Sequence, residues 1–306
     1  MENGIPTNLI DLLGKQYDMD ILNRILKGYR EKRYTTFRIN NLKANICDIE
    51  KQFKKENIKL RQVQYYKNAF IVENADEKQI EQLDAYKNGQ IYIQSLSSML
   101  PPLILDPKPG ENILDMTAAP GSKTTQIASI SNNKALITAC EKNPIRAQRL
   151  KYNIEKQGAE KICLIVKNAC MLDDFFSFDK ILLDAPCTGS GTLQEGAPKY
   201  TEKEFTKEAV NKMSQRQFAL LKKAISILKP GNEMIYSTCS ILEEENEKVI
   251  YKILDTKVAE IVPIHIENLP LLPTKLNGCI CVCPTKEYEG FFMAKIKKKK
   301  LSYKMD

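Results

Sequence analysis

The first ninety residues mix a helical and a strand-like spacing of apolar positions. In residues 8–30, leucines and isoleucines recur at helical spacing. Further on, apolar residues alternate as in a strand at residues 34–43 and 63–74. They follow a helical period at residues 45–57 and 76–87. The pattern predicts a small α+β domain that covers residues 1–90.

After residue 90, short apolar runs alternate with amphipathic helical stretches. The runs predict strands at 111–116, 135–141, 162–169, 180–186 and 233–240, with final strands at 259–266, 278–283 and 290–297. The intervening segments predict helices that end near residue 130 and that cover 144–157, 211–228 and 243–254. Residues 91–306 are therefore expected to form an α/β domain with a doubly wound, mostly parallel sheet covered on both faces.

Composition narrows the class of protein. The 306 residues are 43% hydrophobic and 27% charged, which is typical of a folded globular chain. No long apolar run and no signal-like start is present, so we expect a cytoplasmic protein with no membrane contact. The nine cysteines are scattered, and we expect them to be reduced. A histidine triad or a multi-histidine zinc site would depend on the single His265, which we expect to be structural. Cys279, Cys281 and Cys283 alternate on one strand, and we expect no metal there.

The net charge of +8 lies in two clusters. Residues 24–33 carry +4 and the last twelve residues carry +5, whereas residues 91–294 are neutral. Basic clusters of this kind are typical of proteins that bind polyanions, although solvated faces and a frayed tail would give the same pattern.

Three of the predicted parallel strands end in residues suited to a nucleoside-bearing ligand. Small residues and a helix start follow the first strand, in the segment Thr117-Ala118-Ala119-Pro120-Gly121-Ser122-Lys123, which would let a ligand approach the backbone. The second strand ends in Glu141, which could accept ribose hydroxyls or could lie on the surface, and the third ends in Asn168. The spacing of a Walker A loop is absent, and a purely structural turn stays open for residues 117–123.

The fourth and fifth strands bring two thiols and a carboxylate to the same edge of the sheet. Asp184 and Cys187 follow the fourth strand, and Cys239 follows the fifth. Buried inert cysteines are common, but two at equivalent strand ends favour a shared pocket. A thiolate that adds to C6 of a cytosine makes C5 able to accept a methyl group, and a carboxylic acid can assist this addition through N3 and N4.

Three segments resemble the signature motifs of the Sun/Fmu (RsmB/RsmF-like) family of S-adenosylmethionine-dependent RNA cytosine-5 methyltransferases. They are ILDMTAAPGSKTTQIA, ILLDAPCTGSGTL and IYSTCSILEEENE, and matching segments run from about residue 8 to 298. The resemblance implies a Rossmann-like class I methyltransferase domain in which residues 117–123, Glu141, Asn168 and Asp184 hold S-adenosyl-L-methionine. It also implies Cys239 as nucleophile, Cys187 in resolution of the covalent adduct, and Lys123 near the target base or its phosphate.

The resemblance further implies an N-terminal RNA-binding domain and leaves several points open. Its expected phosphate contacts are Arg24, Lys27, Arg30, Lys32, Arg33 and Arg38. Tyr34 and Phe37 could stack on bases, or Phe37 could pack in the core. Asn168 stands where the family usually has Asp. We expect a monomer that acts on ribosomal RNA, with transfer RNA less favoured; a non-catalytic RNA-binding assembly factor and a DNA cytosine-5 methyltransferase are the alternatives.

Overall fold

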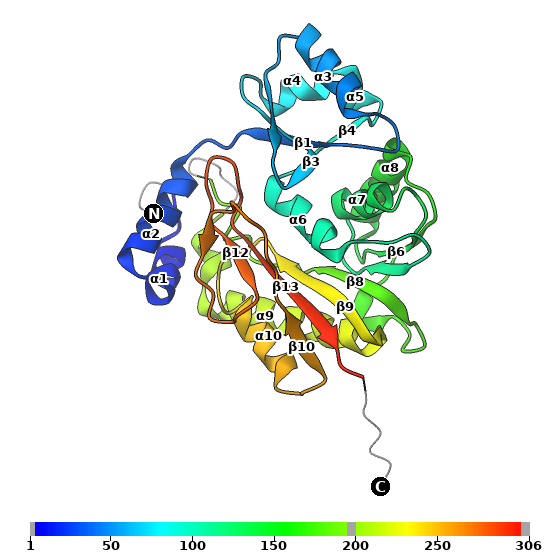
Figure 1. The fold of residues 1–306 in the computed structure, drawn as a ribbon. Helices are drawn as coiled ribbons and strands as arrows, with labels where there is room; N and C mark the ends of the chain where they lie inside the picture. Colours follow the sequence, from blue (N-terminus) through cyan, green and yellow to red (C-terminus); the bar gives the residue numbers. More distant parts are fainter. Residues whose placement is uncertain (1–3, 195–199, 301–306) are drawn as a thin grey trace.

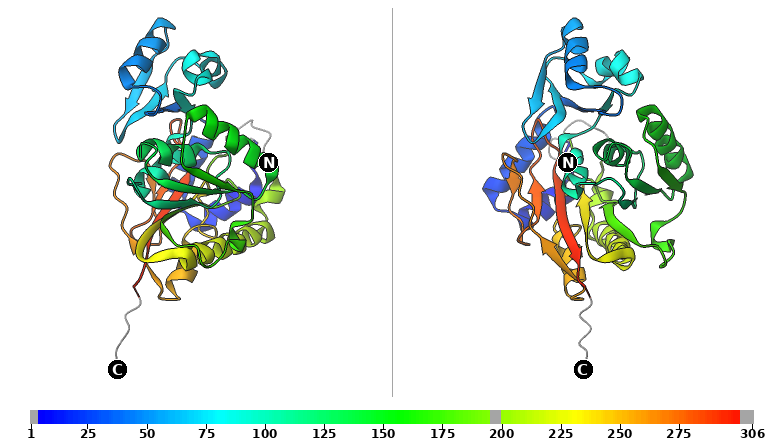
Figure 2. Two further views of the ribbon diagram at one scale, coloured as in Figure 1. Left: turned by 90° about the vertical axis from the view of Figure 1, so that its right-hand side faces the viewer. Right: turned by 45° about the vertical axis from the view of Figure 1, so that its right-hand side comes forward.

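Two β-sheets organise the chain in the computed structural model, which describes residues 4–194 and 200–300. A four-stranded sheet has the order β2-β3-β1-β4, and a nine-stranded sheet has the order β11-β12-β13-β9-β8-β5-β6-β7, with β10 paired to β13. The small sheet with its helices sits on one end of the large domain (Figures 1 and 2). The last six residues of the basic C-terminal cluster, 301–306, lie outside the described residues.

The small sheet is antiparallel and is covered by short helices. Phe37 stacks on Phe53 at 4.9 Å and on Phe70 at 5.6 Å between ring centroids, and this aromatic cluster forms its core. Its elements are β1 (Thr35–Ile39), α3 (Ile46–Lys55), β2 (Leu60–Val63), β3 (Tyr66–Val72), α4 (Glu77–Gln82), α5 (Asp84–Lys87) and β4 (Ile91–Ile93).

The large sheet is parallel over β7, β6, β5, β8 and β9 and antiparallel beyond β9. Its strands are β5 (Asn112–Asp115), β6 (Leu136–Cys140), β7 (Ile162–Ile165), β8 (Phe178–Asp184), β9 (Leu228–Thr238), β10 (Ala259–Val262), β11 (Leu271–Leu272), β12 (Ile280–Val282) and β13 (Phe291–Lys298). Its helices are α6 (Leu96–Leu105), α7 (Ser122–Ile130), α8 (Pro144–Gln157), α9 (Lys207–Ile227) and α10 (Glu247–Leu254), with short 3-10 turns η1 (Ala169–Met171) and η2 (Glu202–Phe205).

Helices cover both faces of the parallel strands, as a doubly wound fold requires. Successive side chains of a strand point to opposite faces, so Ile113 packs in the cluster with α7 whereas Leu114 packs in the cluster with α9 and α10. The prediction of an α/β, doubly wound, Rossmann-like domain is confirmed. Within residues 4–194 and 200–300, no helix is long and apolar enough to cross a membrane.

The N-terminal helices differ from the predicted arrangement. The helix expected over 8–30 is two helices, α1 (Thr7–Gln16) and α2 (Met19–Arg30), because the Asp18 side chain accepts the N–H of Ile21 and starts a new helix. Both helices pack in the core of the large domain, beside β12 (Figure 1). The boundary expected at residue 90 also precedes β4, which belongs to the small sheet.

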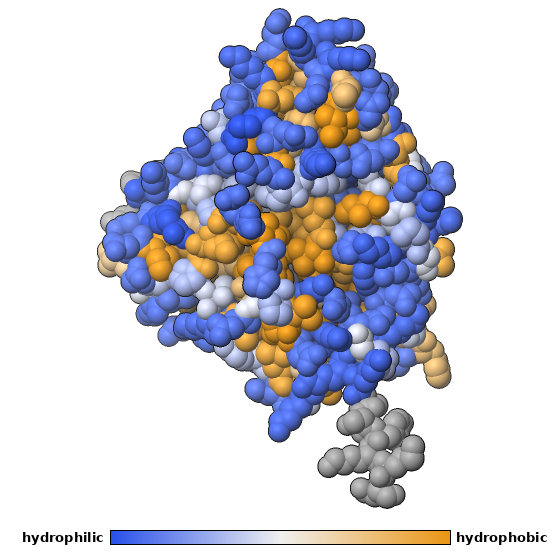
Figure 3. All heavy atoms as spheres, viewed as in Figure 1, coloured by the Kyte–Doolittle hydropathy of each residue, from blue (hydrophilic) through white to orange (hydrophobic). Residues whose placement is uncertain are grey.

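Two further differences concern strand and helix limits. The single strand expected over 63–74 is a hairpin of β2 and β3, with its turn between Val63 and Tyr66. Helix α6 was not predicted, since Pro101 and Pro102 disfavour a helix in a local reading. In Figure 3, hydrophobic side chains gather in the middle of the face below the small domain. A buried hydrophobic cluster joins α6 to β12, β13 and the small sheet.

Candidate active site

Strands β5, β8 and β9 lie side by side, so the residues after their carboxyl ends meet at one edge of the sheet. Asp184, the last residue of β8, is directly opposite Ser237 of β9. The two loops that follow carry the cysteines singled out in the sequence. We call residues 185–194 the Pro-Cys loop and residues 239–246 the Thr-Cys loop.

The two cysteine sulfurs contact each other. The Cys187 Sγ and Cys239 Sγ atoms are 3.0 Å apart, and both thiols are free and partly exposed. The sequence predicts this convergence, but the sulfurs touch instead of facing each other across an open gap. The hydrogen bond with Cys239 and burial raise the pKa of Cys187.

A lysine–aspartate pair lies beside the cysteine loops. The Lys123 Nζ atom is 2.7 Å from Asp184 Oδ2, and Lys123 is only 8% exposed. The same ammonium donates to Ser98 Oγ at 2.8 Å, while Ser237 Oγ donates to the other carboxylate oxygen of Asp184 at 2.8 Å. Because every polar atom of the pair has a partner, the carboxylate is held in one orientation.

The segment after β5 forms a close-fitting cradle of small residues. Ala118 and Ala119 are buried, and Gly121 has φ of +109°. A Cβ added at Gly121 would come within 2.8 Å of the end of the Leu150 side chain, and the positive φ is a conformation that residues with a side chain rarely adopt. Thr117 Oγ1 donates to the backbone oxygen of Asp184 at 2.7 Å, which ties the cradle to β8.

Glu141 and Asn168 lie at the ends of the next two strands, as predicted, and both make local contacts. Glu141 is 4% exposed; it accepts the N–H of Asn143 at 2.8 Å and lies 3.6 Å from Arg146 Nη1. Asn168 is exposed, and its side-chain oxygen accepts the N–H of Cys170 at 3.1 Å. Their part in cofactor binding stays a prediction.

Burial separates the predicted RNA-binding residues into two groups. Arg24, Lys27, Arg30 and Lys32 are exposed. Arg38 is fully buried, so the expectation that it contacts RNA is wrong. Its guanidinium donates to Gln94 Oε1, Ser122 O and Thr125 Oγ1, since its strand faces α7 across the domain junction.

Arg33 and Phe37 also have structural partners. Arg33 donates to the backbone oxygens of Thr192 and Leu193 at 3.0 and 2.7 Å, and burial lowers its pKa. It therefore supports the Pro-Cys loop. Phe37 belongs to the small core, which decides between the two roles left open for it. Tyr34 is partly buried, with Lys286 Nζ 5.7 Å from the centre of its ring.

Sequence reasoning missed several residues that hold the site. Ser98 binds Lys123, Ser237 binds Asp184, and Glu245 and Gln217 bind the Pro-Cys loop. Ser98 could not be found because α6 was not predicted. The buried position of Glu245 within an acidic run, EEENE, gave no signal that distinguishes it from its neighbours.

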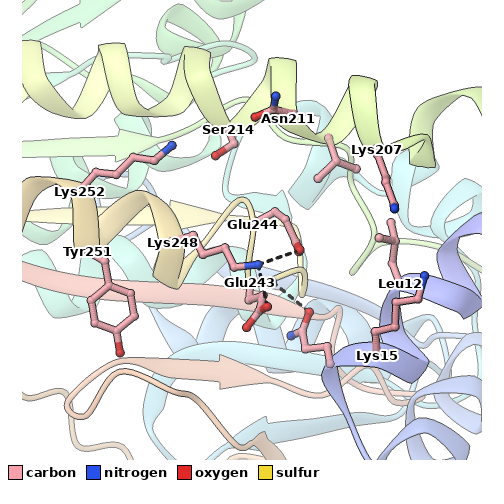
Figure 4. A pocket seen from close by; sticks show the side chains of 12 residues that line it. Leu12, Lys15, Lys207, Asn211, Ser214, Glu243, Glu244, Lys248, Tyr251 and Lys252 are labelled. Atoms are coloured by element: carbon pink, nitrogen blue, oxygen red, sulfur yellow. Dashed lines mark hydrogen bonds and ion pairs between the residues drawn. The ribbon is translucent and has the colours of Figure 1, made fainter.

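Other candidate sites lie apart from the sulfurs. Cys279, Cys281 and Cys283 are buried in the core beside α1 and α2, and His265 is exposed. In the part of the chain that the structure describes, no group of three metal-ligating side chains is found. A cavity of about 620 Å³ opens between α1, α9 and α10, behind the Thr-Cys loop; Lys248 crosses it to Glu243 and Glu244 (Figure 4).

Curated relatives are similar to this chain over most of its length. The ribosomal RNA small subunit methyltransferase F of Shewanella loihica is 33% identical over 277 residues, which cover 86% of this chain and 56% of the relative. The enzyme of the same description from Shewanella frigidimarina is 30% identical and covers 96% of this chain and 62% of its own length. The chain thus spans little more than half the length of these relatives.

Solved structures share the fold. A methyltransferase homologue from Pyrococcus horikoshii is 32% identical with a TM-score of 0.79, over 96% of this chain and all of the other. NSun6 from Pyrococcus horikoshii, solved with SFG, has a TM-score of 0.85 at 24% identity, over 98% of this chain and all of the other. The family model described as 16S rRNA methyltransferase RsmB/F matches residues 102–297. The chain therefore belongs to the RsmB/F family of 16S rRNA methyltransferases.

Proposed function

We propose that the chain transfers a methyl group from S-adenosyl-L-methionine to C5 of a cytosine in structured RNA, with ribosomal RNA favoured over transfer RNA. The observation that carries this proposal is the 3.0 Å contact of the Cys187 and Cys239 sulfurs, beside the Lys123–Asp184 pair. Relatives described as ribosomal RNA small subunit methyltransferases support the choice of RNA.

The cradle after β5 fits the cofactor. Residues 117–123 offer buried small side chains and a glycine with positive φ, which suits the close approach of a methionine moiety. In this proposal the Glu141 carboxylate, at the end of the neighbouring strand, accepts ribose hydroxyls, and the Asn168 side-chain oxygen accepts from the adenine amino group. When bound, the cofactor supplies an electrophilic methyl group.

The protein's own residues make cytosine C5 able to accept that group. The Cys239 thiolate forms a bond to C6, and the electron pair of the C5–C6 double bond moves to C5. Asp184 accepts from the exocyclic amino group, and the Lys123–Asp184 pair provides the proton that N3 takes up. After methylation, C5 loses its proton to a base, N3 returns its proton to the Lys123–Asp184 pair, the double bond reforms and the Cys239 sulfur leaves; Cys187 assists this resolution.

The test uses labelled cofactor, RNA and two variants. Wild-type protein should transfer label to RNA, and Cys239→Ala should abolish the transfer. Cys187→Ala should leave a covalent RNA–protein adduct on a denaturing gel. RNA binding without any transfer, unchanged by either substitution, would refute the proposal in favour of a non-catalytic assembly factor. Bisulfite mapping of cellular RNA with and without the protein identifies the target cytosine.

A further inference from the structure

The Pro-Cys and Thr-Cys loops are joined at two places. The first lies near Cys239, whose backbone oxygen accepts the N–H of Gly191 at 2.9 Å. Next to it, the hydroxyls of Ser190 and Ser240 are 2.9 Å apart, and Ser190 Oγ also accepts the N–H of Ile241 at 2.9 Å. These bonds fix the Cys239 end of the thiol pair.

The second junction lies at Cys187 and depends on Glu245. One carboxylate oxygen of Glu245 accepts the N–H of Thr188 at 2.9 Å, and the other accepts the hydroxyl of Thr188 at 2.6 Å. The Gln217 amide donates both to Glu245 Oε1 at 3.2 Å and to the backbone oxygen of Pro186 at 2.9 Å. Both neighbours of Cys187 in the chain are thus tied to Glu245 or to its partner.

The backbone of Glu245 is held as well. Its carbonyl oxygen accepts the Tyr236 hydroxyl at 2.6 Å, from within β9. On the far side of the Thr-Cys loop, Gln16 of α1 donates to Ile241 O at 2.9 Å and accepts the N–H of Glu243 at 3.0 Å. The carboxylate therefore reaches the Pro-Cys loop from a loop that is itself anchored on both sides.

Glu245 is an unusual residue to bury for stability alone. It is 0% exposed, and its partners at the carboxylate are the Thr188 backbone amide, the hydroxyls of Thr188 and Ser240, and the Gln217 side-chain amide. Burial raises its pKa. Because burying a carboxylate among neutral donors is costly, an apolar contact would join two loops at lower cost. A buried ionisable group beside a reactive thiol is typical of a functional role.

We propose that Glu245 is a positioning residue that holds Cys187 against Cys239 through Thr188. This inference rests on the proposed function, in which Cys187 resolves the covalent adduct. Glu245 contacts no reacting atom in this scheme. It fixes the backbone on both sides of Cys187, directly at Thr188 and through Gln217 at Pro186. Without it, the Cys239 end would keep its bonds to Gly191 and Ser190, whereas the Cys187 end would lose both bonds at Thr188 and keep the Gln217 bond at Pro186.

The first test measures sulfur contact without RNA or cofactor. Diamide oxidises two adjacent thiols to a disulfide and is itself reduced to the hydrazine, so its rate of reaction between Cys187 and Cys239 reports their proximity. Glu245→Ala should slow this cross-link by about tenfold, because displacing reacting atoms by an ångström has effects of this order or larger. Glu245→Gln should keep a rate close to wild type, since its amide can still accept from Thr188 N–H while the Thr188 hydroxyl turns to accept.

Glu247→Ala is the matched control. Glu247 is buried to a similar degree two residues further on, but its carboxylate accepts the N–H of Lys275 and makes no hydrogen bond to the Pro-Cys loop in the part of the chain that the structure describes. It should not change the cross-linking rate. If Glu245→Ala lowers the melting temperature, Thr188→Val replaces it as the test variant. It removes one of the two hydrogen bonds between Thr188 and Glu245 and keeps the side-chain volume. It should slow the cross-link between Cys187 and Cys239 as well.

The second test measures the reaction. Glu245→Ala should accumulate the covalent RNA adduct as Cys187→Ala does, and Glu245→Gln should release it. The proposal would be overturned if Glu245→Ala and Thr188→Val cross-linked at the wild-type rate. It would also be overturned if Glu245→Gln slowed the cross-link as much as Glu245→Ala does. A third outcome is possible: the variants cross-link as predicted, but the wild type transfers no methyl group. That outcome would refute the proposed function and would still support the placement of Cys187 by Glu245.

Discussion

The substitution Arg38→Met separates a structural role of Arg38 from RNA binding. The guanidinium is fully buried between the small sheet and α7. It donates to Gln94 Oε1 at 2.9 Å, to Ser122 O at 3.0 Å and to Thr125 Oγ1 at 2.8 Å, and it lies 4.9 Å from the centre of the Tyr92 ring. Methionine has a similar length, so the change removes these bonds and leaves most of the packing.

The expected loss of stability follows from the acceptors left behind. A buried acceptor without a partner costs about 1–3 kcal/mol; Gln94 Oε1 loses its donor, whereas Ser122 O keeps the Thr125 hydroxyl at 3.3 Å. Relief from burying the guanidinium, whose pKa falls to about 10 through burial, offsets part of this. We expect a net destabilisation of about 1–3 kcal/mol, which lowers the melting temperature by roughly 2–10 °C in a chain of this size.

The assay combines thermal unfolding with RNA affinity at several salt concentrations. Arg38→Met should unfold earlier yet keep the wild-type dependence of affinity on salt, because a buried guanidinium contacts no phosphate. The control Lys27→Gln changes an exposed residue of the basic cluster. It should change stability by no more than about 0.5 kcal/mol and should reduce the slope of log K against log salt by about 0.7–0.9.

The opposite result would refute this reasoning. If Arg38→Met kept its melting temperature and reduced the salt slope as Lys27→Gln is expected to do, the guanidinium would have to leave its buried site to bind RNA. The junction of the two domains would then open in solution.

Three further predictions concern pH, cofactor and packing. Burial raises the pKa of Asp115 to about 6. Between pH 4 and 6 the folded chain therefore holds a proton that the unfolded chain has already lost. Stability should therefore fall by about 3 kcal/mol as pH rises through that window, and Asp115→Asn should remove this fall in urea titrations at each pH. S-adenosyl-L-methionine at 100 times its Kd should stabilise the wild type by about 2.7 kcal/mol; equal stabilisation of Glu141→Ala at the same concentration would contradict the ribose contact. Gly28→Ala should lower the melting temperature, because its Cβ would overlap the backbone oxygen of Pro284; an unchanged value would show that α2 shifts without cost.

The sequence alone determined the part of the site that follows from sheet architecture. Asp184, Cys187 and Cys239 could be placed together because the carboxyl ends of neighbouring parallel strands meet at one edge. The alternation of Cys279, Cys281 and Cys283 likewise placed all three on the same side, where they pack in one core. Local spacing is sufficient for such conclusions, since it fixes which strand a residue follows and which face it points to.

Only the tertiary structure decided which polar residues are buried. Arg38 reads as a basic residue in a basic region, and its partners Ser122 and Thr125 lie 84 and 87 residues further along the chain. Glu245 reads as one of several acids, and its partner Thr188 is 57 residues away. Burial of a charged group depends on donors and acceptors brought from distant segments, so no local pattern reveals it. The same reason explains why α1 and α2, expected in an RNA-binding domain, pack in the core of the large domain.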